Sequence, residues 1–217
     1  MDALININGD GVETLEILFL LTSVSLLPSL LVMMTSFTRI IIILSFLRNA
    51  LGIQQTPPNM VLVGIAIFLT LFIMAPVTDD ITKNAYEPYK AGTITQKQAF
   101  ERAQKPLRNF MLKQTEVNTL DMYMSASGQS TPENPDDIPM RVVIPAFMTS
   151  ELKRAFIMGF LLFIPFLLID IVVSSTLMSM GMIMLPPAMI SLPFKILLFV
   201  TLDGWNLLFS TLMRSFN

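Results

Sequence analysis

Cysteine and histidine are both absent from the 217-residue sequence. Without cysteine the chain has no disulfide, no thiolate nucleophile and no thiolate metal ligand. Without histidine it lacks the side chain most used for proton transfer near neutral pH, which is also the commonest metal ligand. The sequence also shows no nucleotide-binding motif. We therefore expect no metal site, no cofactor and no enzymatic activity.

Charged residues are scarce, at 14% of the chain, whereas a soluble domain carries roughly a quarter. The net charge is only −2, so no strong field would attract nucleic acid, and none is expected as a partner. Hydrophobic residues make up 53% of the chain, and the mean hydropathy is +0.65. This composition indicates a protein whose surface faces lipid or other apolar subunits.

Long uncharged runs predict the layout of the chain, because a membrane-spanning helix needs about 20 mainly apolar residues. Four candidate spans lie at about 16–38, 58–78, 155–178 and 188–213. Residues 39–54, where Arg39 and Arg48 bracket an apolar run, predict a shorter helix that continues the first span or folds back on it. Residues 1–15 lack the basic start of a secretory signal, so the chain inserts by its first apolar helix or has lost its signal.

Residues 79–143 differ sharply from the rest, with eight Lys and Arg and nine Asp and Glu. They predict a soluble, periplasmic insert with amphipathic helices at about 95–124 and a turn-rich tail at 125–139. The predicted fold is all-α, with hydrophobic helical hairpins and a polar helical insert. Its three segments are 1–78 with N-terminal apolar helices, 79–143 with the insert, and 144–217 with a C-terminal apolar hairpin.

Three charges interrupt the C-terminal apolar segment: Asp170, Lys195 and Asp203. Charges at membrane depth usually face a bundle interior, a subunit interface or a water-filled path. One interpretation is a buried ion pair of Lys195 with Asp170 or Asp203 that fixes helix register, and another is an ion path in an ion-coupled transporter. An aspartyl intramembrane protease is a weaker third, because Asp203 lies in Leu-Asp-Gly-Trp and not in Gly-x-Gly-Asp.

Methionine is abundant, with 17 residues, and four of them alternate at one place. These four are Met178, Met180, Met182 and Met184. Gly181 weakens a helix and Pro186-Pro187 breaks one, so this segment predicts a bend between two hydrophobic helices. Flexible methionines at such a bend either fill space between helices or, around a shared axis, form a deformable apolar gasket. The residues alone leave both interpretations open.

Two segments resemble the signatures of the FliP family of flagellar and type III secretion export-gate proteins. They are residues 145–160, PAFMTSELKRAFIMGF, and residues 193–205, PFKILLFVTLDGW. Residues 33–40, 47–52 and 106–115 are also similar to that family, so the resemblance covers nearly the whole chain.

The resemblance implies a pore-forming core subunit of the flagellar protein export gate. In that family several copies assemble with the subunits FliQ and FliR into a closed helical oligomer, through which unfolded export substrates pass. The implied location is the bacterial inner membrane, in the flagellar basal body. The assembled core is expected to project to the periplasmic side, with its apolar helices covered by sister subunits as well as lipid.

The resemblance also assigns roles to single residues. Met182 and Met184 match the family's methionine loop, with Met178 and Met180 beside it. Ile183 stands where relatives often carry a third methionine, and it is grouped with the gasket.

Glu151 and Phe110 resemble family positions that act in subunit assembly. From the residues alone, Glu151 reads as a charge near a helix start and Phe110 as a core contact on an amphipathic helix. Lys195 and Asp203 belong to the second signature, where we expect a pair between helices or between subunits.

Overall fold

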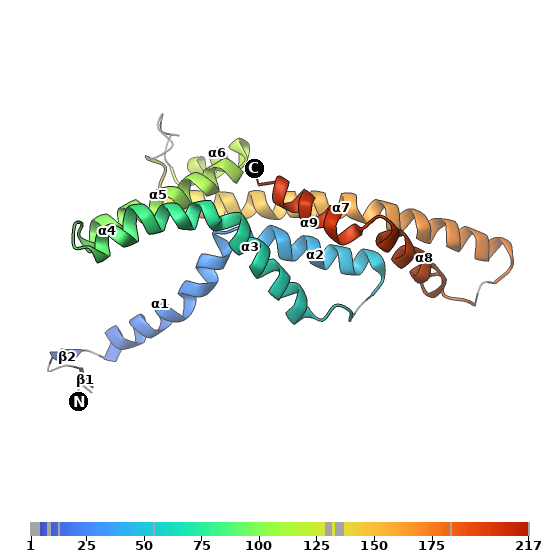
Figure 1. Ribbon diagram of the computed structural model, residues 1–217, viewed down its shortest axis with the longest axis horizontal. Helices are drawn as coiled ribbons and strands as arrows, with labels where there is room; N and C mark the ends of the chain where they lie inside the picture. The colour runs from blue at the N-terminus through green and yellow to red at the C-terminus, as the bar shows by residue number, and fades with distance from the viewer. Residues whose placement is uncertain are drawn as a thin grey trace.

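The computed structural model describes residues 5–7, 10–12, 14–53, 55–128, 132, 137–182 and 184–216. Helices dominate this part of the chain, which confirms the predicted all-helical fold apart from one short antiparallel hairpin of β1 (Ile5–Ile7) and β2 (Asp10–Val12). The helices form an elongated body from which the N-terminal region projects (Figure 1). The expected closed oligomer consists of several chains, so the structure of one chain does not test it.

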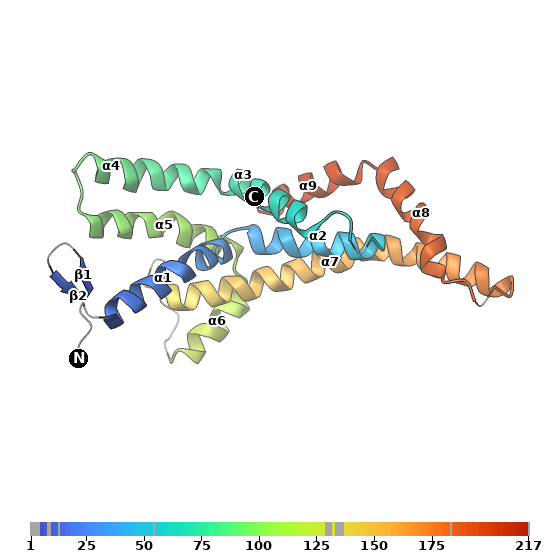
Figure 2. The ribbon, with the colours of Figure 1, turned by 90° about the horizontal axis from the view of Figure 1, so that it is seen from below.

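The first apolar run is divided between two helices, α1 (Thr14–Met33) and α2 (Phe37–Leu51). The predicted span at 16–38 is therefore wrong in extent, whereas the predicted shorter helix is confirmed as α2. The break falls at Thr35, whose hydroxyl donates to Val32 O at 2.7 Å and accepts from the Phe37 N–H at 3.4 Å. Such local side-chain bonds compete with helical ones. Helix α1 projects away from the body in Figure 1, whereas in the turned view of Figure 2 it overlaps α5 and α7.

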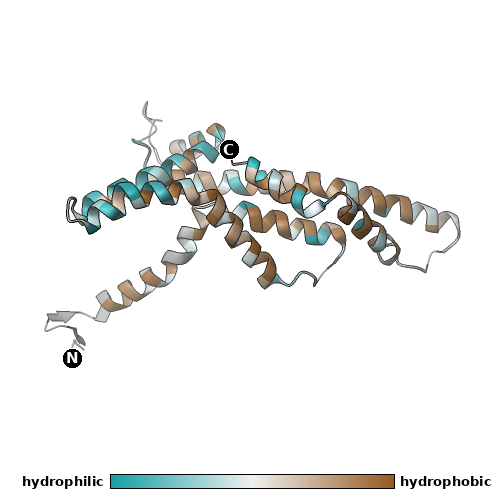
Figure 3. Ribbon diagram, viewed as in Figure 1, coloured by the Kyte–Doolittle hydropathy of each residue, from teal (hydrophilic) through white to brown (hydrophobic). Residues whose placement is uncertain are grey.

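A long continuous helix follows, made of α3 (Asn59–Ile81), the π-helical segment η1 (Thr82–Tyr86) and α4 (Glu87–Lys90). It crosses the predicted segment boundary at residue 79 without interruption. Its first part is apolar and its last part polar, so the change of composition occurs within one helix (Figure 3).

The polar segment then folds back as α5 (Gln96–Gln114) and continues as α6 (Val117–Ala126), which confirms the predicted helices at 95–124. Helix α5 begins with a capping box, in which the Thr95 hydroxyl accepts from the Gln98 N–H and the Gln98 amide oxygen accepts from the Thr95 N–H. Helices α5 and α6 pack on the first turns of α7 through a core cluster. Its fully buried members include Met111, Val143 and Phe147.

Helix α7 (Met140–Ser179) is the longest element, and α8 (Pro187–Thr201) and α9 (Gly204–Arg214) run back along it. The main core lies where α2 packs on α7 and α3. Helix α2 buries Ile40, Ile43, Leu44 and Leu47, which lie on one face at helical spacing. Gly159 of α7 permits close packing, because a Cβ atom there would meet the Phe46 ring at 2.6 Å.

Among the described residues, two helices are long and apolar enough to cross a membrane: Asn59–Lys90 and Met140–Ser179. They contain the predicted spans at 58–78 and 155–178. The predicted span at 188–213 is instead the pair α8 and α9, bent by 63° at residues 202–203. This pair counts as a third candidate span only if the two helices are taken together.

Candidate functional site

The methionine-rich segment forms the turn between α7 and α8, as the glycine and prolines predict. Helix α7 ends in a turn closed by two hydrogen bonds, from the Met182 N–H to Leu177 O and from the Gly181 N–H to Met178 O, both at 3.0 Å. This pattern needs a left-handed residue after the helix, and Gly181 supplies it with φ of +75°. Pro186 then precedes the first turn of α8. The turn is thus built by local backbone chemistry.

The methionines of this turn point outward. The exposed fractions are 67% for Met178, 63% for Met180, 43% for Met182 and 98% for Met184. We name these four residues the methionine tip. It lies at the end of the α7–α8 hairpin, at the far end of the body from the N-terminus (Figure 1). Ile183, which we grouped with them, lies outside the described residues.

Behind the methionine tip, a polar cluster joins α7, α8 and α2. The Lys195 ammonium donates to Asp170 Oδ2 at 2.6 Å and to Ala50 O at 3.1 Å, and the Ser191 hydroxyl donates to Asp170 Oδ1 at 2.6 Å. Lys195 is only 5% exposed. Ala50 lies in the last turn of α2, where a cation also interacts favourably with the helix dipole. The cluster therefore fixes the register of the hairpin against α2.

Asp203 does not take part in this cluster, so the structure does not bring together the three charges that the sequence grouped. Helix α8 ends at Thr201, and Asp203 is exposed at the bend with a left-handed φ of 48°. Its Oδ2 accepts a bond from Asn206 at 3.2 Å. The next residue, Gly204, has a Phe199 ring carbon 2.3 Å from where a Cβ atom would lie. Trp205 packs edge-on against the same ring at 5.2 Å.

Glu151 of α7 is fully buried and forms an ion pair with Arg39 of α2. The Arg39 Nε donates to Glu151 Oε2 at 2.9 Å, and the Nη2 donates to Oε1. The interpretation of Glu151 as a helix-start charge is wrong, because α7 begins eleven residues earlier at Met140. Sequence reasoning missed Arg39 as its partner. The available signal was Arg39 itself, a charged residue near the start of an otherwise apolar helix, because such a charge needs a counter-ion when it is buried.

The guanidinium of Arg39 is 1% exposed and bonded at every nitrogen. Burial lowers the pKa of Arg39 from its ordinary value, and the hydrogen bond and charge of Glu151 oppose that change. Removal of Glu151 would therefore leave a buried cation without its counter-ion.

Phe110 lies between the two core clusters. Its ring is 5.9 Å from that of Phe147 and 6.2 Å from that of Phe216. It is half-buried and also lines a cleft of about 510 Å³ between α3, α5 and α9. The lining of the cleft is mixed, with apolar residues such as Phe72 and polar ones such as Asp80. Phe110 is thus a core contact that remains accessible from one side.

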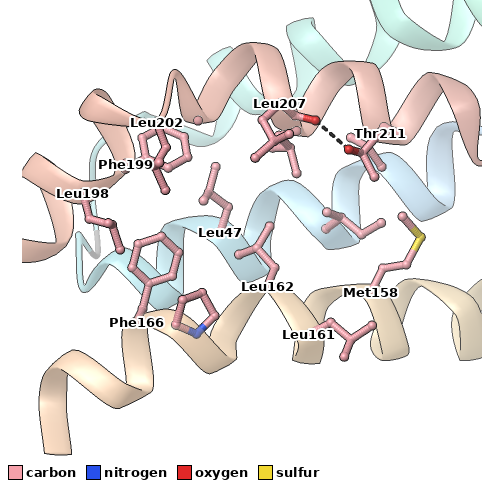
Figure 4. A pocket seen from close by; sticks show the side chains of 15 residues that line it. Leu47, Met158, Leu161, Leu162, Phe166, Leu198, Phe199, Leu202, Leu207 and Thr211 are labelled. Atoms are coloured by element: carbon pink, nitrogen blue, oxygen red, sulfur yellow. Dashed lines mark hydrogen bonds between the residues drawn. The ribbon is translucent and has the colours of Figure 1, made fainter.

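A second cavity, of about 350 Å³, runs between α7 and the α8–α9 pair, with α2 at its base (Figure 4). Leucine and phenylalanine side chains, among them Leu162, Phe166 and Phe199, point into it from several helices. Thr211 also lines it, but its hydroxyl donates to Leu207 O at 2.7 Å within the same helix. We call this cavity the apolar groove. Its lining offers apolar contact to whatever covers it.

The described residues contain no group of three or more acidic, histidine or cysteine side chains that could hold a metal ion. The ion pairs of the described residues include the Lys195–Asp170 and Arg39–Glu151 pairs described above and a more exposed pair, Lys153–Glu116, at 2.6 Å.

Comparison with known proteins gives matches over nearly the whole chain. The sequence model of the FliP family matches residues 20–212. The flagellar biosynthetic protein FliP of Bacillus subtilis (strain 168) is 52% identical over 204 residues, which cover 94% of this chain and 92% of that protein. The protein of the same name from Aquifex aeolicus (strain VF5) is 49% identical over 210 residues, covering 96% and 88%. That of Pectobacterium carotovorum subsp. carotovorum is 52% identical over 211 residues, covering 96% and 82%. The chain therefore belongs to the FliP family of flagellar biosynthetic proteins.

Proposed function

We propose that the chain is a pore-forming core subunit of the flagellar type III protein export gate. Several copies, with FliQ and FliR, would form a closed helical oligomer that conducts unfolded export substrates. Membership of a flagellar biosynthetic family and the apolar helices support a membrane-associated, non-catalytic role in this apparatus. The expected site is the bacterial inner membrane, in the flagellar basal body, with the core on the periplasmic side.

The observation that carries the proposal is the exposure of the methionine tip. An apolar side chain that is 98% exposed, as Met184 is, has no role in the core of this protomer. Methionine is unbranched and polarizable, so copies around one axis can pack into an apolar plug and yield to a passing chain. A dewetted apolar constriction also resists ions. The interpretation of these four methionines as simple space filler is less supported, because little lies beside them to fill.

Extensive apolar surface supports the proposed assembly. Helix α1 exposes Phe19 at 74%, α3 exposes Phe72 at 68%, and the outer half of α7 exposes Phe160 at 64%. The apolar groove and the cleft beside Phe110 add concave surface to these helices. Surfaces of this extent require cover by lipid or by other subunits. We propose that sister copies, FliQ and FliR cover part of them.

The proposed assembly role of Phe110 is a direct one, because its ring is accessible from the cleft. Glu151 acts differently, because its side chain is buried within the protomer. We propose that Glu151 affects assembly by holding α7 against α2, and so by shaping the surface that neighbours contact.

The alternative function, an ion-coupled transporter that uses Asp170, Lys195 and Asp203, finds less support. Lys195 is already bound to both Asp170 and Ala50 O, which suits a fixed structural pair. Asp203 lies apart from them at the α8–α9 bend.

The test is ion conductance of the assembled complex in lipid bilayers. Replacing Met182 and Met184 with alanine removes apolar volume from the proposed seal, so we expect leak conductance to rise by about tenfold or more. The matched control is Met60→Ala, at an exposed methionine on α3. Unchanged leak in an assembled Met182→Ala/Met184→Ala complex would contradict the gasket.

A further inference from the structure

The last described residues of the chain, Ser215 and Phe216, are bound by polar side chains of other helices. The Arg39 Nη1 donates to Ser215 O at 3.1 Å and to Ser215 Oγ at 3.0 Å. The Gln114 Nε2 donates to Phe216 O at 3.0 Å. Carbonyl groups at the end of a helix have no partner within it. Here α2 and α5 supply those partners to the end of α9.

The aromatic ring of Phe216 is bound as well. The Arg39 guanidinium carbon lies 3.8 Å from the ring centroid, close enough for a cation–π interaction. The ring also stacks near-parallel to that of Phe110, with the centroids 6.2 Å apart and an angle of 18° between the planes. Phe216 is only 5% exposed, and it belongs to the main core cluster.

The groups that bind this segment are themselves fixed by bonds that do not involve it. Glu151 holds Arg39 through two hydrogen bonds. Gln114 Oε1 accepts from Arg39 Nη2 at 3.1 Å and from Arg154 Nη1 at 2.9 Å. Four residues from α2, α5 and α7 are thus bonded to one another, and we call them the socket: Arg39, Gln114 and Glu151, which are buried, and Arg154, which is partly buried.

Helix α9 depends on its ends for its position. At its start the chain bends by 63°, and the apolar groove separates part of its length from α7. Leu208 and Leu212 contact the core, while Leu207 on the groove side is 59% exposed. A helix held by few side chains opens more readily than the core on which it lies.

We propose that the socket is an intramolecular binding site whose ligand is the C-terminal segment Ser215–Phe216. The ligand is recognised by two backbone carbonyls, one hydroxyl and one aromatic ring. Its binding fixes α9 on the core and so sets the wall of the apolar groove. This inference does not depend on the proposed pore function.

A cysteine at position 212 tests the proposal, because the natural chain contains none. Leu212 is fully buried on α9, and Ala66 is fully buried on α3 in the same core cluster. The full-length chain carrying Leu212→Cys or Ala66→Cys is purified in detergent and its maleimide labelling rate measured. Each reporter is then combined with a truncation after Arg214, which removes the ligand but leaves the Arg39–Glu151 pair intact.

We expect truncation to raise labelling at position 212 by about tenfold or more, a ratio that the loss of one or two hydrogen bonds produces. Labelling at position 66 should stay slow. Phe216→Ala should act in the same direction. Arg214→Ala is the matched control, since Arg214 lies in the same turn but is exposed, and labelling should not change.

Arg39→Lys separates binding of the segment from stability of the core. Lysine keeps a positive charge beside Glu151 but loses the planar fork that reaches Ser215. We expect faster labelling at position 212 with position 66 still protected. An unchanged rate at position 212 after truncation would overturn the proposal. An equal rise at both positions would also overturn it, because that result describes general loosening of the core.

Discussion

The two halves of α7 differ in what surrounds them, although they belong to one helix. The inner half, residues 140–159, has one buried face: Val143, Phe147 and Glu151 have no exposed surface, and α2, α5 and α6 pack against this part of the helix. The outer half is largely uncovered, with Phe160 at 64%, Leu168 at 63% and Val172 at 58% exposed. The buried contacts of the inner half hold α7 in place against the other helices of the chain. The outer half carries surface that other molecules must cover.

The ion pairs of the two halves also differ in burial. The inner pair, Arg39 and Glu151, is fully buried and bonded on every side. The outer pair, Lys195 and Asp170, has one partly open member, with the Asp170 side chain 31% exposed. Beyond it, the methionine tip depends on no side-chain hydrogen bond that the structure describes. We therefore expect substitutions to cost less stability the nearer they lie to the tip.

The largest effect is expected at Glu151. Glu151→Gln leaves Arg39 buried without its counter-ion, which costs about 3–5 kcal/mol of unfolding free energy. Thermal unfolding in detergent, followed by circular dichroism, measures the change, and native mass spectrometry measures the oligomer. Assembly should fall in parallel with stability.

The double variant Arg39→Met/Glu151→Leu is the control for that experiment. It removes both charges and should recover much of the stability, since an apolar pair can replace a buried ion pair at little cost. A double variant as unstable as Glu151→Gln would show that the pair is needed for more than charge compensation.

A smaller effect is expected at Gly159, near the middle of α7. Gly159→Ala places a methyl group 2.6 Å from the Phe46 ring and should cost about 1–3 kcal/mol through overpacking. Gly64→Ala on α3 is the matched control, because nothing lies within 4 Å of its Cβ position. This control should be neutral or gain up to about 1 kcal/mol from helix propensity. Similar melting temperatures for the two variants would contradict the close contact of α2 and α7.

At the outer pair, Lys195 and Asp170, we expect a smaller loss of stability than at Gly159. Asp170→Asn removes one charge opposite Lys195, and it should cost about 1–2 kcal/mol because solvent reaches the carboxylate. Asp203→Asn should change the melting temperature little, since this exposed residue is not bonded to Lys195 and asparagine tolerates the left-handed conformation. Equal costs at the two positions would refute the separation of Asp203 from the pair.

The smallest stability effect is expected at the tip. Met184→Ala should change the unfolding free energy by less than about 0.5 kcal/mol, because the side chain is 98% exposed. If the methionine tip seals a pore, the same variant should raise leak conductance, so stability and conductance would change independently. A large loss of stability in the isolated protomer would instead place Met184 in a packed core.

Sequence reasoning predicted the helices where local signals are strong. Gly181 and Pro186-Pro187 mark the α7–α8 turn, and the amphipathic pattern of the polar segment predicted helices where α5 and α6 lie. It failed at the break after Met33, because the hydroxyl residues there, Thr35 and Ser36, resemble a Thr-Ser pair at 22–23 that lies inside α1. The bend before Gly204 depends on contact with Phe199, which is a tertiary relation.

The sequence was enough to predict which charged residues belong to the candidate site, but not which residues they pair with. Asp170 and Lys195 were correctly singled out as charges in an apolar segment, but hydropathy cannot tell which carboxylate a lysine reaches. Arg39 and Glu151 are 112 residues apart in sequence, and Arg39 also contacts the chain end, 176 residues away. Only the packing of α2 on α7 brings these groups together.

The π-helical segment Thr82–Tyr86 affects how α5 packs against the long helix of α3, η1 and α4. A π turn holds about one residue more than an α turn, so every side chain after it is rotated by about 100° around the helix axis. The face of α3 that meets α2 and the face of η1 that meets α5 are therefore out of phase. A single extra residue lets one continuous helix present its first part to the core and its last part to a different neighbour.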